Sequence, residues 1–238
     1  MWARWVLAGL VLVCAGCELR LDVEAALDRD GGGRLEVAVT ADDDLLTRAR
    51  TAGAEPLDDL AAAGRALGRG WDVADTTDAR GRRTVALAAR ARNPAGFQRL
   101  AADLAGALAA PEVALLSPLR VTVDGERLVV EGAAGLQPTE AVAELGLTPE
   151  QAVTLLRDEA AFGYAVRLAL PGPVLGSTAE RQDDGVLTWV VEPGEQVTVH
   201  AVGERPPPPL WPLVVGAVLG MLFAALVLRR LVVVRRRR

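Results

Sequence analysis

One cysteine near the start of the chain stands in a setting that suits acylation of its thiol. Two small residues, Ala15 and Gly16, precede Cys17, as in a bacterial lipobox, in which the cysteine is acylated and becomes the mature N-terminus. Cys14 occupies the position where that pattern prefers leucine. We therefore predict lipidation of Cys17. Ordinary cleavage near the same place and an uncleaved signal anchor are the alternatives.

The acidic residues offer several other candidate sites. Asp28-x-Asp30-Gly resembles the start of a calcium loop, but the later ligands and the closing glutamate of an EF-hand are absent, which favours a solvated hairpin loop. The run 42–44 is acidic and suits the start of a helix better than a metal site. The cluster 157–159 (Arg-Asp-Glu) fits an exposed helix end. A glycosidase-like pair of acids stays open, because distances in space are not visible in a sequence.

Nucleophilic and zinc chemistry lack the residues that they need. The only histidine, His200, lies in an alternating run that predicts an exposed position on a strand. The only serines are Ser117 and Ser177, and both cysteines belong to the signal region. Ser-His catalysis, Cys-His catalysis and a zinc site of the usual type are therefore disfavoured. We predict no catalytic, cofactor-binding or metal-binding residue and expect that the protein is not an enzyme.

Both ends of the chain predict contact with a membrane. Residues 1–16 have a short basic start and an apolar run that is too short to span a bilayer, which is typical of a signal peptide. Residues 210–228 form an uncharged run of 19 residues, about 28 Å long as a helix, which predicts a transmembrane helix. The tail 229–238 carries six arginines and is expected in the cytoplasm, which places the main domain outside the cell membrane.

Two glycines within the predicted span, Gly216 and Gly220, have the spacing that lets two helices approach closely. A homodimer formed through this span is therefore one expectation. Glycine is also common in membrane helices generally, which is the alternative.

The charges are distributed unevenly along the chain. All 31 acidic residues lie in the range 18–205, whereas seven of the 26 basic residues, all arginines, lie outside it. That range therefore has a formal net charge of about −12, which excludes nucleic-acid binding through phosphate contacts. Because the mature exterior domain has no disulfide, it must be stabilised by its hydrophobic core alone.

The exterior region alternates between strand-like and helix-like patterns. Period-2 runs flanked by turn residues predict strands at 19–26, 34–40, 71–74, 84–91, 119–123, 127–131, 164–170, 186–191 and 196–202. Helical patterns with start signals cover 42–52, 57–67, a stretch from Asn93 and a stretch from Thr148 to about Ala160. The predicted fold class is α+β, an antiparallel β-sheet with packed helices, plus one C-terminal transmembrane helix. A proline stalk, 206–209, joins the domain at 17–205 to the span.

Several of these segments also resemble a known family. The segments are Cys17-Glu-Leu-Arg-Leu-Asp-Val-Glu with Leu35-Glu-Val-Ala-Val, and, further on, Leu168-Ala-Leu-Pro-Gly-Pro-Val, residues 185–194 and residues 199–201. They resemble the first hairpin and the C-terminal sheet of the LppM-domain family, which are actinobacterial and cyanobacterial envelope lipoproteins. Residues 95–160 match less and are interpreted as a helical and β-hairpin insertion. The resemblance implies an α+β envelope lipoprotein that is able to hold a lipid, and it carries no catalytic residues.

Together these observations predict a membrane-tethered, extracytoplasmic binding domain of the cell envelope. Its expected ligand is a lipid or glycolipid, and no cofactor is expected. A structural role through contacts with an envelope protein is the alternative, and an acid-dependent hydrolase is the third reading. An apolar pocket would favour the lipid, whereas a solid core with an exposed apolar patch would favour a protein partner.

Overall fold

The computed structural model of the chain describes residues 18–51, 53–109, 113–138, 148–158 and 162–207. Contacts divide the chain into two units, 1–205 and 206–238. Every strand and helix within these described ranges lies in the first unit.

The larger sheet, which we call sheet A, has β1 in the middle of its seven strands. Its order is β10 (Arg181–Asp183), β11 (Val186–Val190), β8 (Phe162–Ala169), β1 (Leu19–Leu27), β2 (Gly33–Ala41), β4 (Arg83–Ala91) and β3 (Trp71–Thr77). β1 pairs antiparallel with β2 and parallel with β8, and the other pairs in this sheet are antiparallel. The first described strand of the chain is thus bonded on both sides.

The smaller sheet, sheet B, is built from the later part of the chain. Its order is β5 (Val113–Leu116), β7 (Arg127–Pro138), β12 (Gln196–Glu204) and β9 (Val174–Ser177), and β6 (Arg120–Asp124) also pairs with β7. The predicted hairpin at the Asp124-Gly125 turn is confirmed, with Gly125 at φ 57°, a conformation that glycine adopts without steric cost.

Four helices lie among the described residues: α2 (Asp43–Thr51), α3 (Pro56–Ala66), α4 (Pro94–Ala107) and α5 (Pro149–Asp158). Two predicted start signals are confirmed. The Asn93 side chain accepts a hydrogen bond from the Gly96 amide at 2.8 Å, and a capping box joins Thr148 to Gln151 in both directions. These contacts satisfy amides that the helix itself leaves unpaired.

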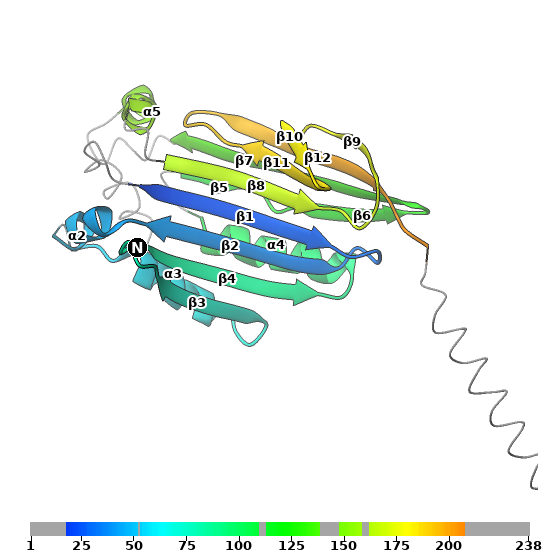
Figure 1. The fold of residues 1–238 in the computed structure, drawn as a ribbon, viewed down its shortest axis with the longest axis horizontal. Helices are drawn as coiled ribbons and strands as arrows, with labels where there is room; N and C mark the ends of the chain where they lie inside the picture. Colours follow the sequence, from blue (N-terminus) through cyan, green and yellow to red (C-terminus); the bar gives the residue numbers. More distant parts are fainter. Residues whose placement is uncertain (1–17, 52, 110–112, 139–147, 159–161, 208–238) are drawn as a thin grey trace, which may run out of the picture. The chain divides into compact units, whose positions relative to one another are not determined.

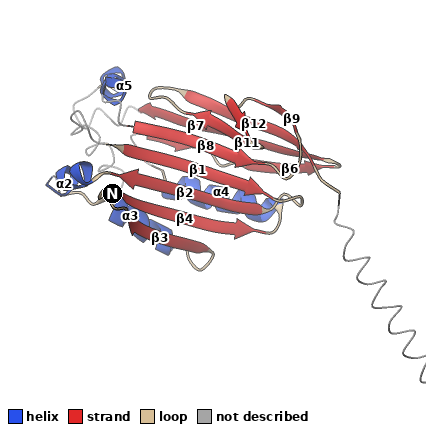
Figure 2. Cartoon of the chain, viewed as in Figure 1, coloured by secondary structure: helices blue, strands red, loops and turns tan. Residues whose placement is uncertain are grey.

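Sheet A is covered on one face by helices and by sheet B. Helix α3 contacts β3 and β4, while α4 contacts β2, β4 and β6, so α4 lies between the two sheets. Figures 1 and 2 show α3 and α4 behind sheet A. On the other face of sheet A, Arg167 Nη1 lies 2.9 Å from both the Asp22 and the Glu24 carboxylates, which links β8 to β1.

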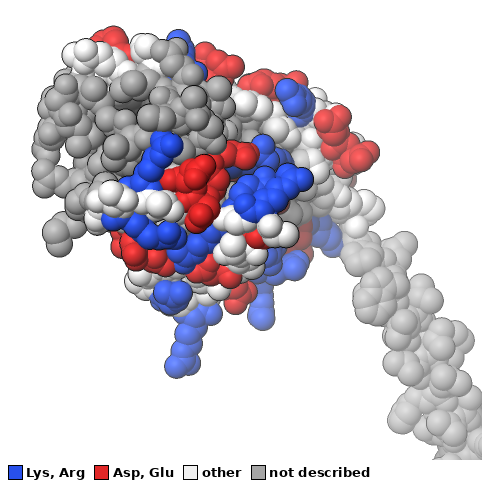
Figure 3. Space-filling model, turned by 60° about the vertical axis from the view of Figure 1, so that its left-hand side comes forward, with Lys and Arg blue, Asp and Glu red and all other residues white. Residues whose placement is uncertain are grey.

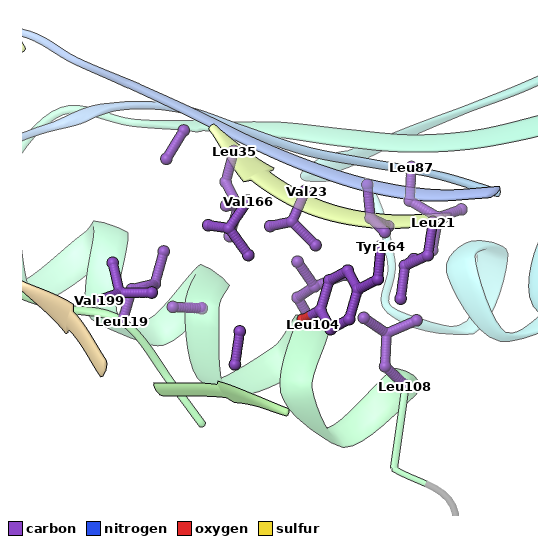
Figure 4. Close-up of a cluster of buried hydrophobic side chains, with 14 of the residues drawn as sticks. Leu21, Val23, Leu35, Leu87, Leu104, Leu108, Leu119, Tyr164, Val166 and Val199 are labelled. Atoms are coloured by element: carbon purple, nitrogen blue, oxygen red, sulfur yellow. The ribbon is translucent and has the colours of Figure 1, made fainter. Parts of the chain in front are cut away.

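The core fills the space between these layers. Along β1, Leu21, Val23, Ala25 and Leu27 are buried and alternate with polar or small residues, as period-2 burial requires. Figure 4 shows Leu21, Val23, Leu35, Tyr164 and Val166 of sheet A pointing toward Leu104 of α4 and toward Leu119 and Val199. All of these side chains are at most 4% exposed and belong to one cluster.

The predicted fold class, an antiparallel α+β sheet with a C-terminal transmembrane helix, is wrong. The described chain is mostly β, in two sheets rather than one, and sheet A contains a parallel pair. No helix among the described residues is long and apolar enough to cross a bilayer. The physical reason for the two sheets is that β6, β7 and β12 carry a second set of buried apolar side chains, which pack into the same core as those of sheet A.

Several predictions concern residues outside the described ranges. They are the signal peptide 1–16, lipidation of Cys17, the span 210–228 with Gly216 and Gly220, and the tail 229–238.

A pair of glycine substitutions tests the packing of the helices. A Cβ added at Gly64 of α3 would overlap Leu87 Cδ2, whereas one at Gly106 of α4 meets nothing within 4 Å. We expect Gly64→Ala to lower the free energy of unfolding by about 1–3 kcal/mol through overpacking. Gly106→Ala, the matched control, should raise it by about 0.4–1 kcal/mol. Urea unfolding followed by circular dichroism measures both, and equal effects would contradict the close approach of α3 to β4.

Candidate functional site

The candidate site is the end of the domain at which the described chain begins. Cys17 lies outside the described residues, and Glu18 directly follows it. The Glu18 amide donates to the Asp42 carboxylate, and the Asp42 amide donates to the Glu18 carbonyl at 3.1 Å. Strand β1 begins one residue later, at Leu19. The backbone is therefore fixed within one peptide bond of the predicted acylation site.

Asp42 holds two elements with one carboxylate. Its Oδ2 accepts from the Glu18 amide, while its Oδ1 accepts from the Leu45 amide at 2.8 Å in the first turn of α2. The second contact is an N-cap, and the interpretation of the acidic run 42–44 as a helix start is confirmed. Any displacement of Glu18 thus acts on the start of α2 as well as on β1.

The turn between β3 and β4 lies beside this contact. Asp78 Oδ1 accepts from the amides of Arg80 and Arg82 at 2.8 and 3.0 Å, and its other oxygen lies 2.8 Å from the Arg82 guanidinium. These bonds hold the pKa of Asp78 below its usual value. Arg82 also lies 3.9 Å from Glu18, and a Cβ at Gly81 would be 3.7 Å from Asp43. The turn, Glu18 and α2 are therefore neighbours.

A second ion-pair cluster ties α3 to the edge of sheet A. The Arg83 guanidinium lies 2.6 Å from Asp58 of α3 and 2.7 Å from Asp75 of β3. Hydrogen bonds from Arg83 lower the pKa of both carboxyls, and the two carboxylates raise the pKa of Arg83. Figure 3, in which the left-hand side of the view in Figure 1 comes forward, shows acidic side chains bordered by basic ones.

We call this end of the domain, defined by Glu18, Asp42 and the turn 78–82, the tether end. Its chemistry does not match that of a catalytic acid. Among the carboxyls that the structure describes, the pKa departs from its usual value at Asp58, Asp75, Asp78 and Glu150, and all four are shifted downward. A general acid working near neutral pH needs a raised pKa. Within the described ranges no three acidic, histidine or cysteine side chains are grouped so as to hold a metal ion.

The remaining predicted candidates lie elsewhere. The Asp28 carboxylate accepts from the amides of Asp30 and Gly32 at 3.1 and 3.0 Å, which makes residues 28–32 a hairpin turn, as predicted. His200 is on β12 with its side chain 40% exposed, 4.0 Å from Glu131. Arg157 donates to the carbonyl of Pro193 at 3.0 Å. None of these contacts belongs to the tether end.

The exit of the chain from the domain is fixed at the opposite end of the strands. Arg205 Nε donates to the Arg29 carbonyl at 2.7 Å, and its guanidinium lies 2.8 Å from the Asp30 carboxylate. The Arg205 amide also donates to the Glu126 carbonyl at 2.7 Å. These contacts join the β1–β2 turn of sheet A to the β6–β7 turn of sheet B.

Sequence reasoning placed the turn at 78–81 but missed the contacts of Arg82 and Arg83. One signal was available. The turns 28–32 and 78–82 both begin with aspartate and have glycine three residues later, at positions 31 and 81. The same two backbone hydrogen bonds form in each turn. The amide of the first residue donates to the carbonyl of the fifth, and the amide of the fourth residue donates to the carbonyl of the first. The repeated pattern identifies two equivalent hairpin turns. It does not reveal which charges each one meets.

Comparison with known proteins finds similarity among solved structures. No family model matches the chain, and no curated protein matches it. Among solved structures, the folded domain of LppM from Mycobacterium tuberculosis is similar, with a TM-score of 0.51 and 16% sequence identity. The similarity covers 83% of this chain and 95% of that domain.

Asp42 provides the first test of the tether end. Asp42→Ala removes the N-cap of α2 and the acceptor for the Glu18 amide, and we expect it to lower the free energy of unfolding by about 1–2 kcal/mol. Asp42→Asn is the matched control, because an asparagine oxygen can still cap Leu45. Asp42→Asn should lower the free energy of unfolding by less than half as much as Asp42→Ala does. Urea unfolding monitored by circular dichroism measures both, and equal losses would show that the cap contributes nothing.

The Arg83 cluster predicts a pH dependence. Because the pKa values of Asp58 and Asp75 are lowered on folding, their contribution to stability is present above the unfolded pKa of about 3.9 and is lost as pH falls through the folded values. Arg83→Gln should therefore lower the urea midpoint at pH 7, and the difference from the parent should shrink below pH 4. Arg80→Gln, in the exposed turn nearby, is the control. A difference that stays constant between pH 7 and pH 3 would contradict the ion pairs.

Proposed function

Because the chain folds as an LppM-like domain, as its hairpins and last strands predicted, we propose that it is a binding domain of the cell envelope. It lies outside the cytoplasmic membrane and is held there by an acyl chain on Cys17. The observation that carries this proposal is the bond between Glu18 and Asp42, which fixes the backbone next to the predicted acylation site. A lipid at that position would hold the folded domain directly at the surface.

The domain binds and does not catalyse. Asp78 at the tether end and the two carboxylates of the Arg83 cluster are ion-paired, and the pKa of each is lowered, which suits charge neutralisation more than proton transfer. On the exposed side of sheet A, the Arg167 guanidinium likewise neutralises the carboxylates of both Asp22 and Glu24. The chemistry of these groups is that of a scaffold presenting a charged surface.

The ligand is a lipid or glycolipid bound at the surface of the domain. The side chains between sheet A and α4 are tightly buried, with Val23, Leu35 and Leu104 at 0% exposure, so the apolar pocket that would have favoured a lipid does not lie between these elements, and the proposed ligand binds at the surface instead. Leu175, which is 54% exposed on the edge strand β9, offers an apolar contact at that surface. Nothing in this arrangement requires a cofactor.

A protein partner in the envelope is the second candidate. The observation that favours it is the row of paired charges across β8, β1 and β2. Arg167 on β8 contacts Asp22 and Glu24 on β1. On β2, the side chain of Arg34 lies 2.8 Å from that of Glu36. Such a row on a regular sheet can pair with complementary charges on another protein.

Mass spectrometry of the full-length protein purified from its own host tests the proposal. Under denaturing conditions we expect the mature chain to begin at Cys17 and to carry acyl chains on it. Under native conditions we expect an additional mass, lost on denaturation, that corresponds to a bound lipid or glycolipid. An additional protein subunit in its place would favour the second candidate.

The matched control uses the neighbouring cysteine. Cys17→Ser should abolish acylation, whereas Cys14→Ser, three residues earlier, should leave it intact, because only Cys17 follows the two small residues. Acyl chains that persist in the Cys17→Ser protein, or a mature N-terminus elsewhere, would refute the tether.

A further inference from the structure

We propose that the tether end is the face of the domain that lies on the lipid headgroups. The inference rests on the proposed acylation of Cys17 and adds an orientation to it. The occupant of this surface is a lipid bilayer, because very little chain separates the acylated residue from the fold. Glu18, the residue after Cys17, is already bonded to Asp42 through its amide and its carbonyl.

The chain between Cys17 and the fold is too short to act as a flexible linker. A flexible linker of several residues would let the domain turn over, because its reach grows with the number of residues. Here one peptide bond separates Cys17 from the bonded amide of Glu18, and β1 begins at Leu19. β1 is bonded to β2 on one side and to β8 on the other, so it transmits the position of the tether to the whole of sheet A.

The residues beside Glu18 are therefore the ones that meet the headgroups. Arg82 lies 3.9 Å from Glu18, and the turn that carries it also carries the exposed Arg80. The first turn of α2, with the exposed Asp43 and Asp44, begins next to the same turn. Guanidinium groups bind phosphate well, whereas the carboxylates are repelled by it.

Because these charges oppose one another, the acyl tether, and not electrostatic attraction, determines which face of the domain contacts the bilayer. The domain has a formal net charge of about −12, and anionic headgroups repel such a domain as a whole. Without the acyl group, the mixed surface of the tether end offers no net attraction that would select it over the rest of the domain. The orientation should therefore be the same on zwitterionic and anionic bilayers.

The opposite end of the domain provides the reference position. β1 has nine residues from Leu19 to Leu27, which corresponds to about 26 Å along the strand. At its far end the β1–β2 turn lies close to the β6–β7 turn, since Arg205 bonds to the carbonyls of both Arg29 and Glu126. Figure 1 shows the start of β1 and the β1–β2 turn at opposite ends of sheet A.

A pair of single-cysteine variants of the full-length protein tests the orientation. Thr77→Cys places a thiol on the exposed residue before the turn at the tether end, and Asp124→Cys places one on the exposed residue before the far turn. The mature, acylated chain has no other free thiol, because Cys14 leaves with the signal peptide and Cys17 carries lipid. Each variant is labelled with a fluorophore and reconstituted into phosphatidylcholine vesicles that contain a headgroup-attached quencher.

We expect the label at residue 77 to be quenched several-fold more than the label at residue 124. The ratio should stay the same when phosphatidylglycerol replaces part of the phosphatidylcholine. Adding Asp42→Asn, which keeps the helix cap and removes the acceptor for Glu18, should bring the two values closer together. Equal quenching at both positions, stronger quenching at residue 124, or a ratio that depends on lipid charge would overturn the proposal.

Failure of the tether itself is distinguishable from failure of the orientation. The parent protein without an added cysteine is treated with the same thiol reagent. If it takes up label at Cys17, acylation is absent and the proposed function fails. If it takes up none while the labels at residues 77 and 124 are quenched equally, the tether stands and the orientation is wrong.

Discussion

The pairing of β1 on both of its edges is the constraint on which the rest of this structure depends. β1 joins β2, its neighbour in the chain, and β8, more than 140 residues later; Arg167 on β8 bonds to Glu24 across the join. Because a central strand has no free edge, its backbone groups are satisfied within the sheet and its apolar side chains, such as Val23, are fully buried. The segment nearest the predicted acylation site is therefore among the most firmly held in the domain.

The first described residues of the domain are tied down, which such boundary segments need in order to be well ordered. Here the tie begins at Glu18, through Asp42, and continues along β1 without interruption. The exit is also fixed, through Arg205. Two equivalent turns serve the two ends: residues 28–32 contact the exit, and residues 78–82 contact the entry. One local backbone pattern thus supports different contacts according to the charges that the sheet brings to it.

The sequence allowed the elements to be predicted far better than their assembly. Helix starts at Asn93 and Thr148 depend on contacts three residues apart, and the Asp124-Gly125 hairpin depends on adjacent residues, so local patterns reveal them. The second sheet was missed, because the pairing of β7 with β12 joins distant residues and leaves no local signal. At the candidate site the same limit applied. The turn at Asp78 was predictable, whereas the contact of Arg82 with Glu18 required the fold.

Charge and attachment therefore have separate roles in this domain. An ion pair exposed to water contributes little to stability, and clusters such as Arg83 with Asp75 serve mainly to neutralise acids that would otherwise repel one another within an acidic protein. The same acidity keeps the domain from adhering to anionic lipid on its own. The acyl chain proposed on Cys17 would then have to supply the attachment to a surface, and its effect on the domain would be directional because Asp42 bonds both to Glu18 and to the start of α2.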